Sequence, residues 1–344
     1  MVVSVVDDDP ILIWGAGAIG GILGAYFARA GQAVHMVDVV EDHVEAMRDE
    51  GLQIQGPVEE FRQRLASDTP ASLRGQFRRV ILAVKAHHTE EALEALVDHL
   101  SDDGFVVSAQ NGLNERRIAE RIGSERTLGC FVNFGADWLS PGRILYGNRA
   151  AVALGELDGA CTQRLCDMHA LFQTVEPNAV TTDNIWGYLW GKLGYGALLF
   201  ATALTPESMA DAMDSQVHRG VYAKLGTEVM QLAAVEGIEP LGFNGFDPKA
   251  FATGDQAGIA QSLKAMVEHN RQTAKTHSGI YRDLAVRKRK TEVDAQMGIM
   301  LEIARRHGRA TPALAALCDL IHDIENNQRE QSMGVLDVML QRCA

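Results

Sequence analysis

Three glycines near the start of the chain have the spacing of a dinucleotide-binding turn. They are Gly15, Gly17 and Gly20, and they follow the apolar run ILIW directly. The first permits a tight turn, the second lets the backbone approach a pyrophosphate, and the third lets helix and strand pack closely. A helical pattern follows from Ala18 to Arg29, and the free N–H groups at its start favour phosphate oxygens. The alternative is a glycine-rich turn with a structural role only.

The whole loop is expected to contact the dinucleotide, through Gly15, Ala16, Gly17, Ala18, Ile19 and Gly20. Asp38 closes the next predicted strand, AVHMVDVV. A carboxylate there accepts hydrogen bonds from the ribose 2′-OH and repels a 2′-phosphate. No Arg or Lys follows directly, so we predict NAD rather than NADP as the cofactor. The alternative is that Asp38 only caps the following helix.

Strand and helix patterns alternate through the first 145 residues, which predicts a parallel sheet with helices on both faces. The strands are expected at 11–14, 33–40, 79–86 and 105–112, and the helices at 18–29, 41–50 and 90–100. An extended strand at 149–157 is expected to close this domain. Helical patterns then dominate, at 160–173, 184–203, 215–236, 258–275, 292–307 and 312–325, with a loop at 240–248.

We therefore predict an α/β Rossmann domain, a doubly wound parallel sheet, over residues 1–180. An all-α domain is expected to follow over residues 181–344. The boundary is placed in the segment 176–183, where Pro and polar turn residues cluster.

Composition narrows the class of protein further. The 344 residues include 32 Lys and Arg against 45 Asp and Glu, a net charge of −13 that disfavours nucleic-acid binding. Five cysteines without metal-ligand spacing indicate a reducing compartment and no metal site. The start of the chain lacks the features of a secretory signal, and the apolar stretch at 193–204 is too short to span a bilayer. We expect a soluble cytoplasmic protein that binds no membrane.

Six short motifs together resemble the ketopantoate reductase family, whose members reduce 2-dehydropantoate. They are GAGAIGG at 15–21, AVKAHHTEEAL at 83–93, QNGLNE at 110–115, SPGRI at 140–144, WGKL at 190–193 and KTEVD at 290–294. The resemblance implies a Rossmann domain followed by an all-helical domain, with the active site in the cleft between them. This agrees with the organisation expected from the patterns above.

The resemblance also implies roles for individual residues. Lys192 matches the family's catalytic lysine, and Glu292 matches a glutamate at the nicotinamide end of the site. Lys85 and Asn111 match residues near the cofactor, with Asn111 also near the substrate, and Ala136 matches a small residue beside the nicotinamide amide. Each also has a structural alternative. A lysine can lie along apolar surface, Asn-Gly is a common turn pair, and a glutamate is favoured in a first helical turn.

These residue types suit hydride transfer to a carbonyl group, which leaves negative charge on the oxygen. The ammonium of Lys192 can stabilise that charge and donate the proton. In the oxidising direction the neutral amine takes the alcohol proton. A carboxylate such as Glu292 can orient the lysine.

The sequence departs from the family where its substrate contacts lie. The family's catalytic lysine is followed by Asn four and often eight residues on, whereas this chain has Gly196 and Phe200. Positions i, i+4 and i+8 share one helix face, so we expect both residues to contact the substrate, together with Tyr188. The changes predict a substrate that is larger and more apolar or aromatic. The alternative is that the aromatic residues of this helix belong to the core.

A second departure concerns a serine that contacts substrate in the family. The corresponding position here is Gly279, and either His277 or Ser278 could replace the lost contact; the sequence leaves this open. The nearby basic run at 287–290 is interpreted as a solvated approach to the next helix.

The leading interpretation is an NAD-dependent dehydrogenase that acts on a secondary alcohol or ketone, including 2-hydroxy and 2-keto acids, with Lys192 as acid and base. One alternative is a genuine 2-dehydropantoate 2-reductase that uses NADPH. Others are an isomerase or lyase with bound NAD that oxidises transiently, and a non-catalytic NAD sensor. We expect a small-molecule substrate and a homodimer.

Overall fold

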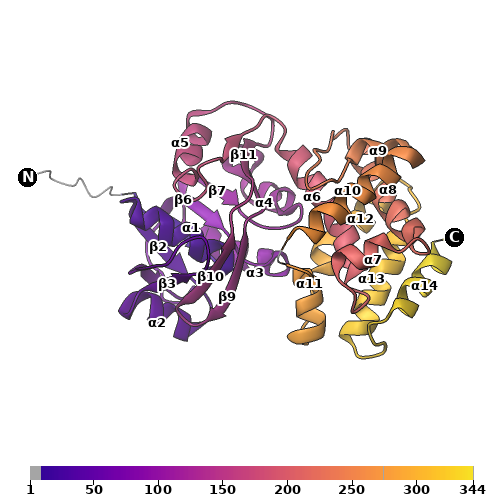
Figure 1. Ribbon diagram of the computed structural model, residues 1–344. Coiled ribbons are helices and arrows are strands. Elements are labelled where there is room, and N and C mark those ends of the chain that lie inside the picture. The colour runs from indigo at the N-terminus through magenta and orange to yellow at the C-terminus, as the bar shows by residue number, and fades with distance from the viewer. Residues whose placement is uncertain (1–8, 274, 344) are drawn as a thin grey trace, which may run out of the picture. The chain divides into compact units, whose positions relative to one another are not determined.

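Short apolar strands and amphipathic helices alternate through the first half of the chain, and helices fill the second half (Figure 1). In this computed structural model, which describes residues 9–273 and 275–343, the chain divides into two units between Ile185 and Trp186. The division lies close to the boundary expected at residue 180. Each unit has its own core of buried apolar residues.

The first unit is built on an eight-stranded sheet. Its order is β12 (Val180–Thr181), β11 (Val152–Glu156), β8 (Thr127–Val132), β7 (Leu100–Ser108), β6 (Phe77–Leu82), β1 (Ile11–Trp14), β2 (Val34–Val37) and β5 (Ala66–Asp68). Only the β8–β11 pair is antiparallel among these strands. The chain turns from β1 to β2 on one side and reaches β6 on the other. Ligands of such sheets bind at this reversal, beyond the carboxyl ends of the strands.

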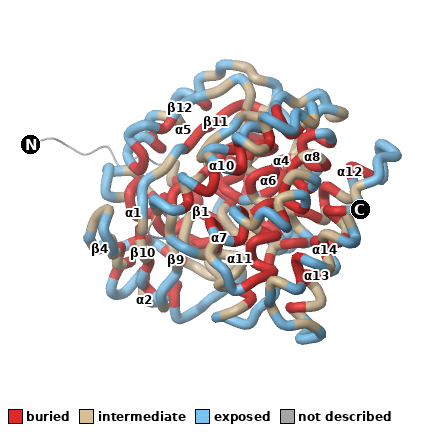
Figure 2. The backbone as a smooth tube through the Cα atoms, turned by 45° about the vertical axis from the view of Figure 1, so that its right-hand side comes forward, coloured by how far each residue is buried: buried red, intermediate tan, exposed pale blue. Residues whose placement is uncertain are grey.

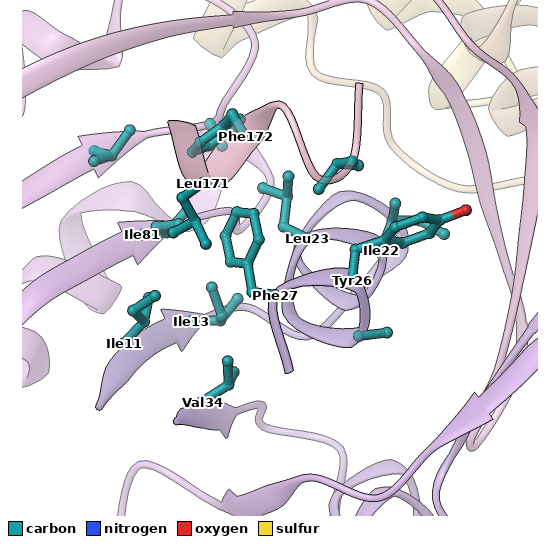
Figure 3. Close-up of a cluster of buried hydrophobic side chains, with 14 of the residues drawn as sticks. Ile11, Ile13, Ile22, Leu23, Tyr26, Phe27, Val34, Ile81, Leu171 and Phe172 are labelled. Atoms are coloured by element: carbon teal, nitrogen blue, oxygen red, sulfur yellow. The ribbon is translucent and has the colours of Figure 1, made fainter. Parts of the chain in front are cut away.

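Helices cover both faces of this sheet. Ile11 and Ile13 face α1 (Ala18–Arg29) and α5 (Gln163–Phe172), and Leu12 and Trp14 lie in a second cluster with α3 (Thr89–Leu96) and α4 (Asn114–Ile122). Figure 3 shows Phe27 of α1 between the sheet and Phe172 of α5, with ring centroids 5.4 Å apart. Both faces are apolar because a central parallel strand is buried on each side. The predicted doubly wound α/β domain followed by a helical domain is confirmed.

A second sheet in the first unit was not expected from the sequence. It runs in the order β4 (Phe61–Gln63), β3 (Leu52–Gln55), β10 (Arg143–Asn148) and β9 (Gly135–Ser140). It packs on α1 so closely that a Cβ at Gly21 would collide with Ile144 Cδ1. Its strands come from two distant segments, and α2 (Glu41–Asp49) leads into the first of them. The short run LQIQ alternates apolar and polar residues, which is the signal that could have revealed β3.

The second unit is helical. Its α-helices are α6 (Ile185–Thr202, whose first residue closes the first unit), α7 (Met209–Asp214), α8 (Arg219–Val235), α9 (Pro248–Thr253), α10 (Gln256–Arg271), α11 (Gly279–Tyr281), α12 (Ile299–Arg306), α13 (Pro312–Glu325) and α14 (Met333–Arg342). Short 3-10 and π turns complete the chain: η1 (Ala86–His88), η2 (Val97–His99), η3 (Ser124–Arg126), η4 (Arg282–Val286) and η5 (Asp294–Gly298). The pattern at 160–173 proves to be α5 of the first unit, and α7, α9 and α14 were not expected.

Most residues of helix α6 are buried. Figure 2 colours most of its length as buried, and the side chains of Trp190, Leu198 and Phe200 are fully buried. A helix that is apolar nearly all round belongs in the core of its unit. Within residues 9–273 and 275–343, none of the helices combines the length and the hydropathy needed to cross a bilayer.

Candidate functional site

The glycine turn between β1 and α1 has three different environments at its three glycines. Gly15 has φ of +98° and donates its N–H to Val37 O at 2.8 Å, and a Cβ there would lie 2.7 Å from Val84 N. A Cβ at Gly20 would collide with Gly15 O. At Gly17, by contrast, no described atom lies within 4 Å of the Cβ position. The turn is therefore crowded on the protein side and open at its tip.

The start of α1 is suited to an anion. Gly17 is the N-cap and offers no side chain, and the first turn of the helix contains no acidic residue. Ala18 and Ile19 are half-buried, and the first helical bond runs from Gly21 N to Gly17 O. The preceding N–H groups are left for an external acceptor, and the positive end of the helix dipole favours a phosphate. The pyrophosphate of a dinucleotide fits this open, donor-rich tip.

Asp38 lies directly against the glycine turn. Its Oδ2 accepts the N–H of Ala16 at 2.9 Å, and its Oδ1 accepts the N–H of Val40 at 3.0 Å. Each carboxylate oxygen has a second lone pair, so both can also accept from a ligand. The helix that follows has Val40 as its N-cap and no side-chain cap, so Asp38 is not that helix's N-cap residue.

A buried histidine that was not predicted from the sequence forms a hydrogen bond with the backbone of the same turn. His43 is 1% exposed; its Nδ1 accepts the N–H of Gly142 at 2.9 Å, and its Nε2 lies 2.8 Å from Ala16 O. Because Nδ1 is an acceptor, Nε2 carries the proton and donates to Ala16 O. The N–H and the C=O of Ala16 are thus both held by side chains. No local motif marks His43, because its partner Gly142 is distant in sequence.

The loops that carry Lys85 and Asn111 are joined by buried amides. Gln110 Nε2 donates to Val84 O and to Thr89 Oγ1, both at 2.9 Å. Asn114 Nδ2 donates to the backbone oxygen of Asn111 at 2.6 Å.

These loops follow the neighbouring parallel strands β6 and β7, so they share the edge of the sheet at which the glycine turn lies. Lys85 is half-buried and Asn111 is exposed. Ala136 lies on β9 opposite Tyr146 and is also half-buried.

In the second unit, one narrow stripe of α6 is accessible. Tyr188, Lys192 and Gly196 are half-exposed at positions i, i+4 and i+8, between neighbours that are buried. Lys192 therefore lies on an accessible face of an otherwise apolar helix. Trp190 and Tyr195 are in the core, in agreement with the structural alternative for these two aromatics. Burial raises the pKa of Tyr195, which keeps its hydroxyl neutral.

Phe200 does not join this stripe, because its exposed fraction is 0%. Phe200, eight residues after Lys192, was expected to share its accessible face and contact the substrate. That expectation is wrong, because the side chain of Phe200 is buried in the core.

Glu292 lies on a segment that is anchored to α13. Both the N–H and the hydroxyl of the preceding residue, Thr291, donate to Glu325 Oε1 at 2.7 Å. Glu292 is half-buried, and its backbone oxygen accepts the N–H of Gln296 at 2.9 Å. Glu325 was not singled out in the sequence, because its partner lies in a separate segment.

The two candidates for the lost serine contact both have structural roles. Ser278 is 2% exposed and caps α11 by accepting the N–H of Tyr281 at 3.1 Å. The ring nitrogens of His277 lie 2.9 Å from Thr276 Oγ1 and 3.0 Å from Pro206 O. These contacts account for both side chains without a ligand.

The basic run at 287–290 is partly neutralised, since Arg287 and Arg289 pair with Asp283 at 3.1 and 2.9 Å. The described part of the chain contains no cluster of three or more His, Cys, Asp or Glu residues suited to a metal ion.

A crowded glycine turn with an open tip, followed by a helical unit with an accessible lysine, defines the class of dinucleotide-dependent oxidoreductases with a Rossmann domain. Two family models refine this class. "Ketopantoate reductase PanE/ApbA" matches residues 11–159, and "Ketopantoate reductase PanE/ApbA C terminal" matches residues 184–325. The chain therefore belongs to the ketopantoate reductase family, whose members are oxidoreductases that use a nicotinamide dinucleotide.

Two curated relatives carry the same name. The 2-dehydropantoate 2-reductase of Halobacterium salinarum is 26% identical over 317 residues, covering 90% of this chain and 97% of the relative. That of Mesorhizobium japonicum is 27% identical over 337 residues, covering 90% and 96%. The similarity thus extends over nearly the full length of both proteins.

Solved structures share the fold. A PanE/ApbA family ketopantoate reductase from Ralstonia eutropha has a TM-score of 0.77 at 22% identity, covering 93% of this chain and 100% of that one. D-mandelate dehydrogenase, in a ternary structure with NADH and anilino(oxo)acetate, has a TM-score of 0.77 at 24% identity, covering 92% and 99%.

The open position at Gly17 yields a direct test of the turn. A Cβ at Gly17 meets no described atom within 4 Å, so we expect the Gly17→Val protein to fold. Its side chain would occupy the space in front of the helix start, and we expect dinucleotide affinity to fall at least about tenfold, or about 1.4 kcal/mol. Titration of intrinsic fluorescence with NADH and NADPH measures this. Gly334→Ala, on α14, is the matched control. Unchanged affinity in a folded Gly17→Val protein would contradict this assignment of the turn.

Proposed function

We propose that this chain interconverts a 2-oxo acid and the corresponding 2-hydroxy acid with a nicotinamide dinucleotide. The names of the curated relatives favour 2-dehydropantoate as the substrate, with reduction as the direction. The observation that carries the proposal is the accessible stripe on α6, in a chain of this family. Lys192 is the positively charged residue of that stripe. An ammonium group with apolar surroundings can stabilise the negative charge that develops on a substrate oxygen during the reaction.

The residues of the protein are proposed to act on one substrate atom, the oxygen of the reacting carbonyl or hydroxyl group. The bound dinucleotide supplies or accepts the hydride at the carbon that bears this oxygen. Lys192 Nζ donates a hydrogen bond to the oxygen, stabilises its negative charge and delivers the proton. Glu292 is proposed to orient the lysine and to favour its charged form. In the reverse direction the neutral amine accepts the proton from the alcohol.

The first unit is proposed to bind and orient the dinucleotide. The N–H groups at the start of α1 would hold the pyrophosphate, and Lys85, Asn111 and Ala136 would lie along the nicotinamide half. The Gln110 bridge between the loops of Lys85 and Asn111 supports this, because it limits how far either loop can move. A reacting geometry depends on such limits, since small displacements lower the rate.

A second candidate function is an NAD-dependent dehydrogenase with another 2-hydroxy acid as substrate. Two observations favour it. Asp38 holds a carboxylate beside the glycine turn, which opposes a 2′-phosphate, and Gly196 lacks the amide found in the family. D-mandelate dehydrogenase, a relative in fold, was solved with NADH. The family's usual reductases use NADPH, so substrate and cofactor have to be tested together.

The decisive experiment is an initial-rate assay with every pairing of substrate and cofactor. We expect 2-dehydropantoate, or another 2-oxo acid from a panel of aliphatic and aromatic acids, to oxidise NADH or NADPH, followed by absorbance. Activity on 2-dehydropantoate with NADPH above all other pairs supports the family's own reaction. Tightly bound cofactor with turnover but no net oxidation would indicate an isomerase or lyase, and binding without any turnover would indicate a sensor. Homodimer formation, which also stays a prediction, is checked by light scattering.

Lys192→Ala is expected to lower kcat by about 10²–10⁴-fold, the range for removal of a general acid. Dinucleotide binding should be retained, because the lysine is assigned to the substrate oxygen. Steady-state kinetics and cofactor titration measure the two effects separately. Lys264→Ala removes an exposed lysine of α10 and serves as the control. A Lys192→Ala enzyme with at least half of the normal kcat would contradict the role.

Asp38→Asn is expected to shift cofactor preference towards NADPH by about tenfold in the ratio of kcat/KM values. The amide oxygen can still accept the N–H of Ala16, while the charge that repels a 2′-phosphate is removed. Asp42→Asn, an exposed acid in the first turn of α2, is the matched control. If the unaltered protein already prefers NADPH, the interpretation of Asp38 as an NAD determinant is wrong.

A further inference from the structure

Gly196 leaves an open notch one turn after Lys192 on the accessible stripe of α6. A Cβ built at Gly196 would lie 4.0 Å from Gln296 Oε1, and no other described atom outside its own helix backbone comes within 4 Å. The four-residue separation from Lys192 corresponds to about 6 Å along the helix axis. This is a distance that a small hydroxy acid can span. The polar group that borders the notch is thus a side chain from a different segment of the same unit.

Gln296 is held in this position by its backbone. It lies in the π turn η5, four residues after Glu292, whose backbone oxygen accepts its N–H at 2.9 Å. The start of the segment is fixed to Glu325 through Thr291. Single π turns are frequent at functional sites. Gln296 therefore approaches the notch at Gly196 from an anchored segment.

The side-chain amide of Gln296 has no hydrogen-bond partner among residues 9–273 and 275–343, although the residue is half-buried. A partly buried amide that is left to solvent can bind a ligand, because it loses no protein contact when it does so. It offers an N–H donor and a C=O acceptor. These match a further hydroxyl or carboxylate group that a substrate carries a few bonds from the reacting carbon.

We propose that Gln296 is a specificity-determining residue that hydrogen-bonds a polar group of the substrate across the notch at Gly196. The inference rests on the proposed function and deepens it, because it names a polar contact that Gly196, which has no side chain, cannot make. The notch at Gly196 is what admits the longer side chain. The substrate class that fits is a 2-oxo or 2-hydroxy acid with a further hydroxyl or carboxylate a few bonds from the reacting carbon.

The test is Gln296→Leu, assayed with the best substrate of the panel and with an analogue that lacks its distal polar group. We expect KM for the polar substrate to rise at least about tenfold, or about 1.4 kcal/mol, while kcat changes less than about threefold. KM for the analogue should stay the same. Gln272→Leu, an exposed glutamine at the end of α10, is the matched control.

A rescue experiment separates contact with substrate from a structural role. Gln296→Ala should raise KM in the same way, and adding Gly196→Asn should lower it again, since the asparagine returns an amide from α6. Equal changes of KM for the two substrates, or no change, would overturn the proposal while the activity itself stands. If the unaltered protein turns over no 2-oxo acid although it binds dinucleotide, the proposed function fails first, and this inference fails with it.

Discussion

The dinucleotide site depends on how the backbone N–H and C=O of Ala16 are held. Asp38 accepts its N–H and His43 donates to its C=O, so two side chains fix the direction of the turn before any ligand arrives. A glycine-rich loop has many conformations in isolation, and ordering it costs free energy. Because the protein itself orders the loop, a phosphate group meets N–H donors that already point outward. Gly15 and Gly20 add to this, since neither position has room for a side chain.

The helical unit places charged and polar groups on a framework that is otherwise apolar. Most of α6 is buried, and its accessible stripe is narrow enough that a few positions decide its chemistry. Lys192 occupies one of these positions and Gly196 the next. The segment from Thr291 to Gln296 adds a carboxylate and an amide, and it is anchored by Glu325 rather than by apolar packing alone. The amide of Gln296 thus lies beside a part of α6 whose other residues are mostly buried.

Sequence patterns predicted the parts of the structure that are set by local spacing. The glycine turn, the central strands and the long helices follow from periods of 2 and 3.6 residues, and the doubly wound class follows from their alternation. The second sheet was missed because it pairs β3 with β10, whose strands lie far apart in sequence. His43 and Gln296 were missed for the same reason. Phe200 shows the converse error, since helical spacing places residues on a face but does not decide where the core covers that face.

The ring of His43 also joins two parts of the first unit that share no strand pairing. Its Nδ1 holds the N–H of Gly142, in the turn between β9 and β10, while its other nitrogen holds Ala16. Tightening the turn at Ala16 therefore tightens the hairpin, and loosening the hairpin releases the turn. We therefore expect hydrogen exchange at the Gly142 amide to slow when a ligand binds the turn of Ala16, although the amide itself does not contact that turn.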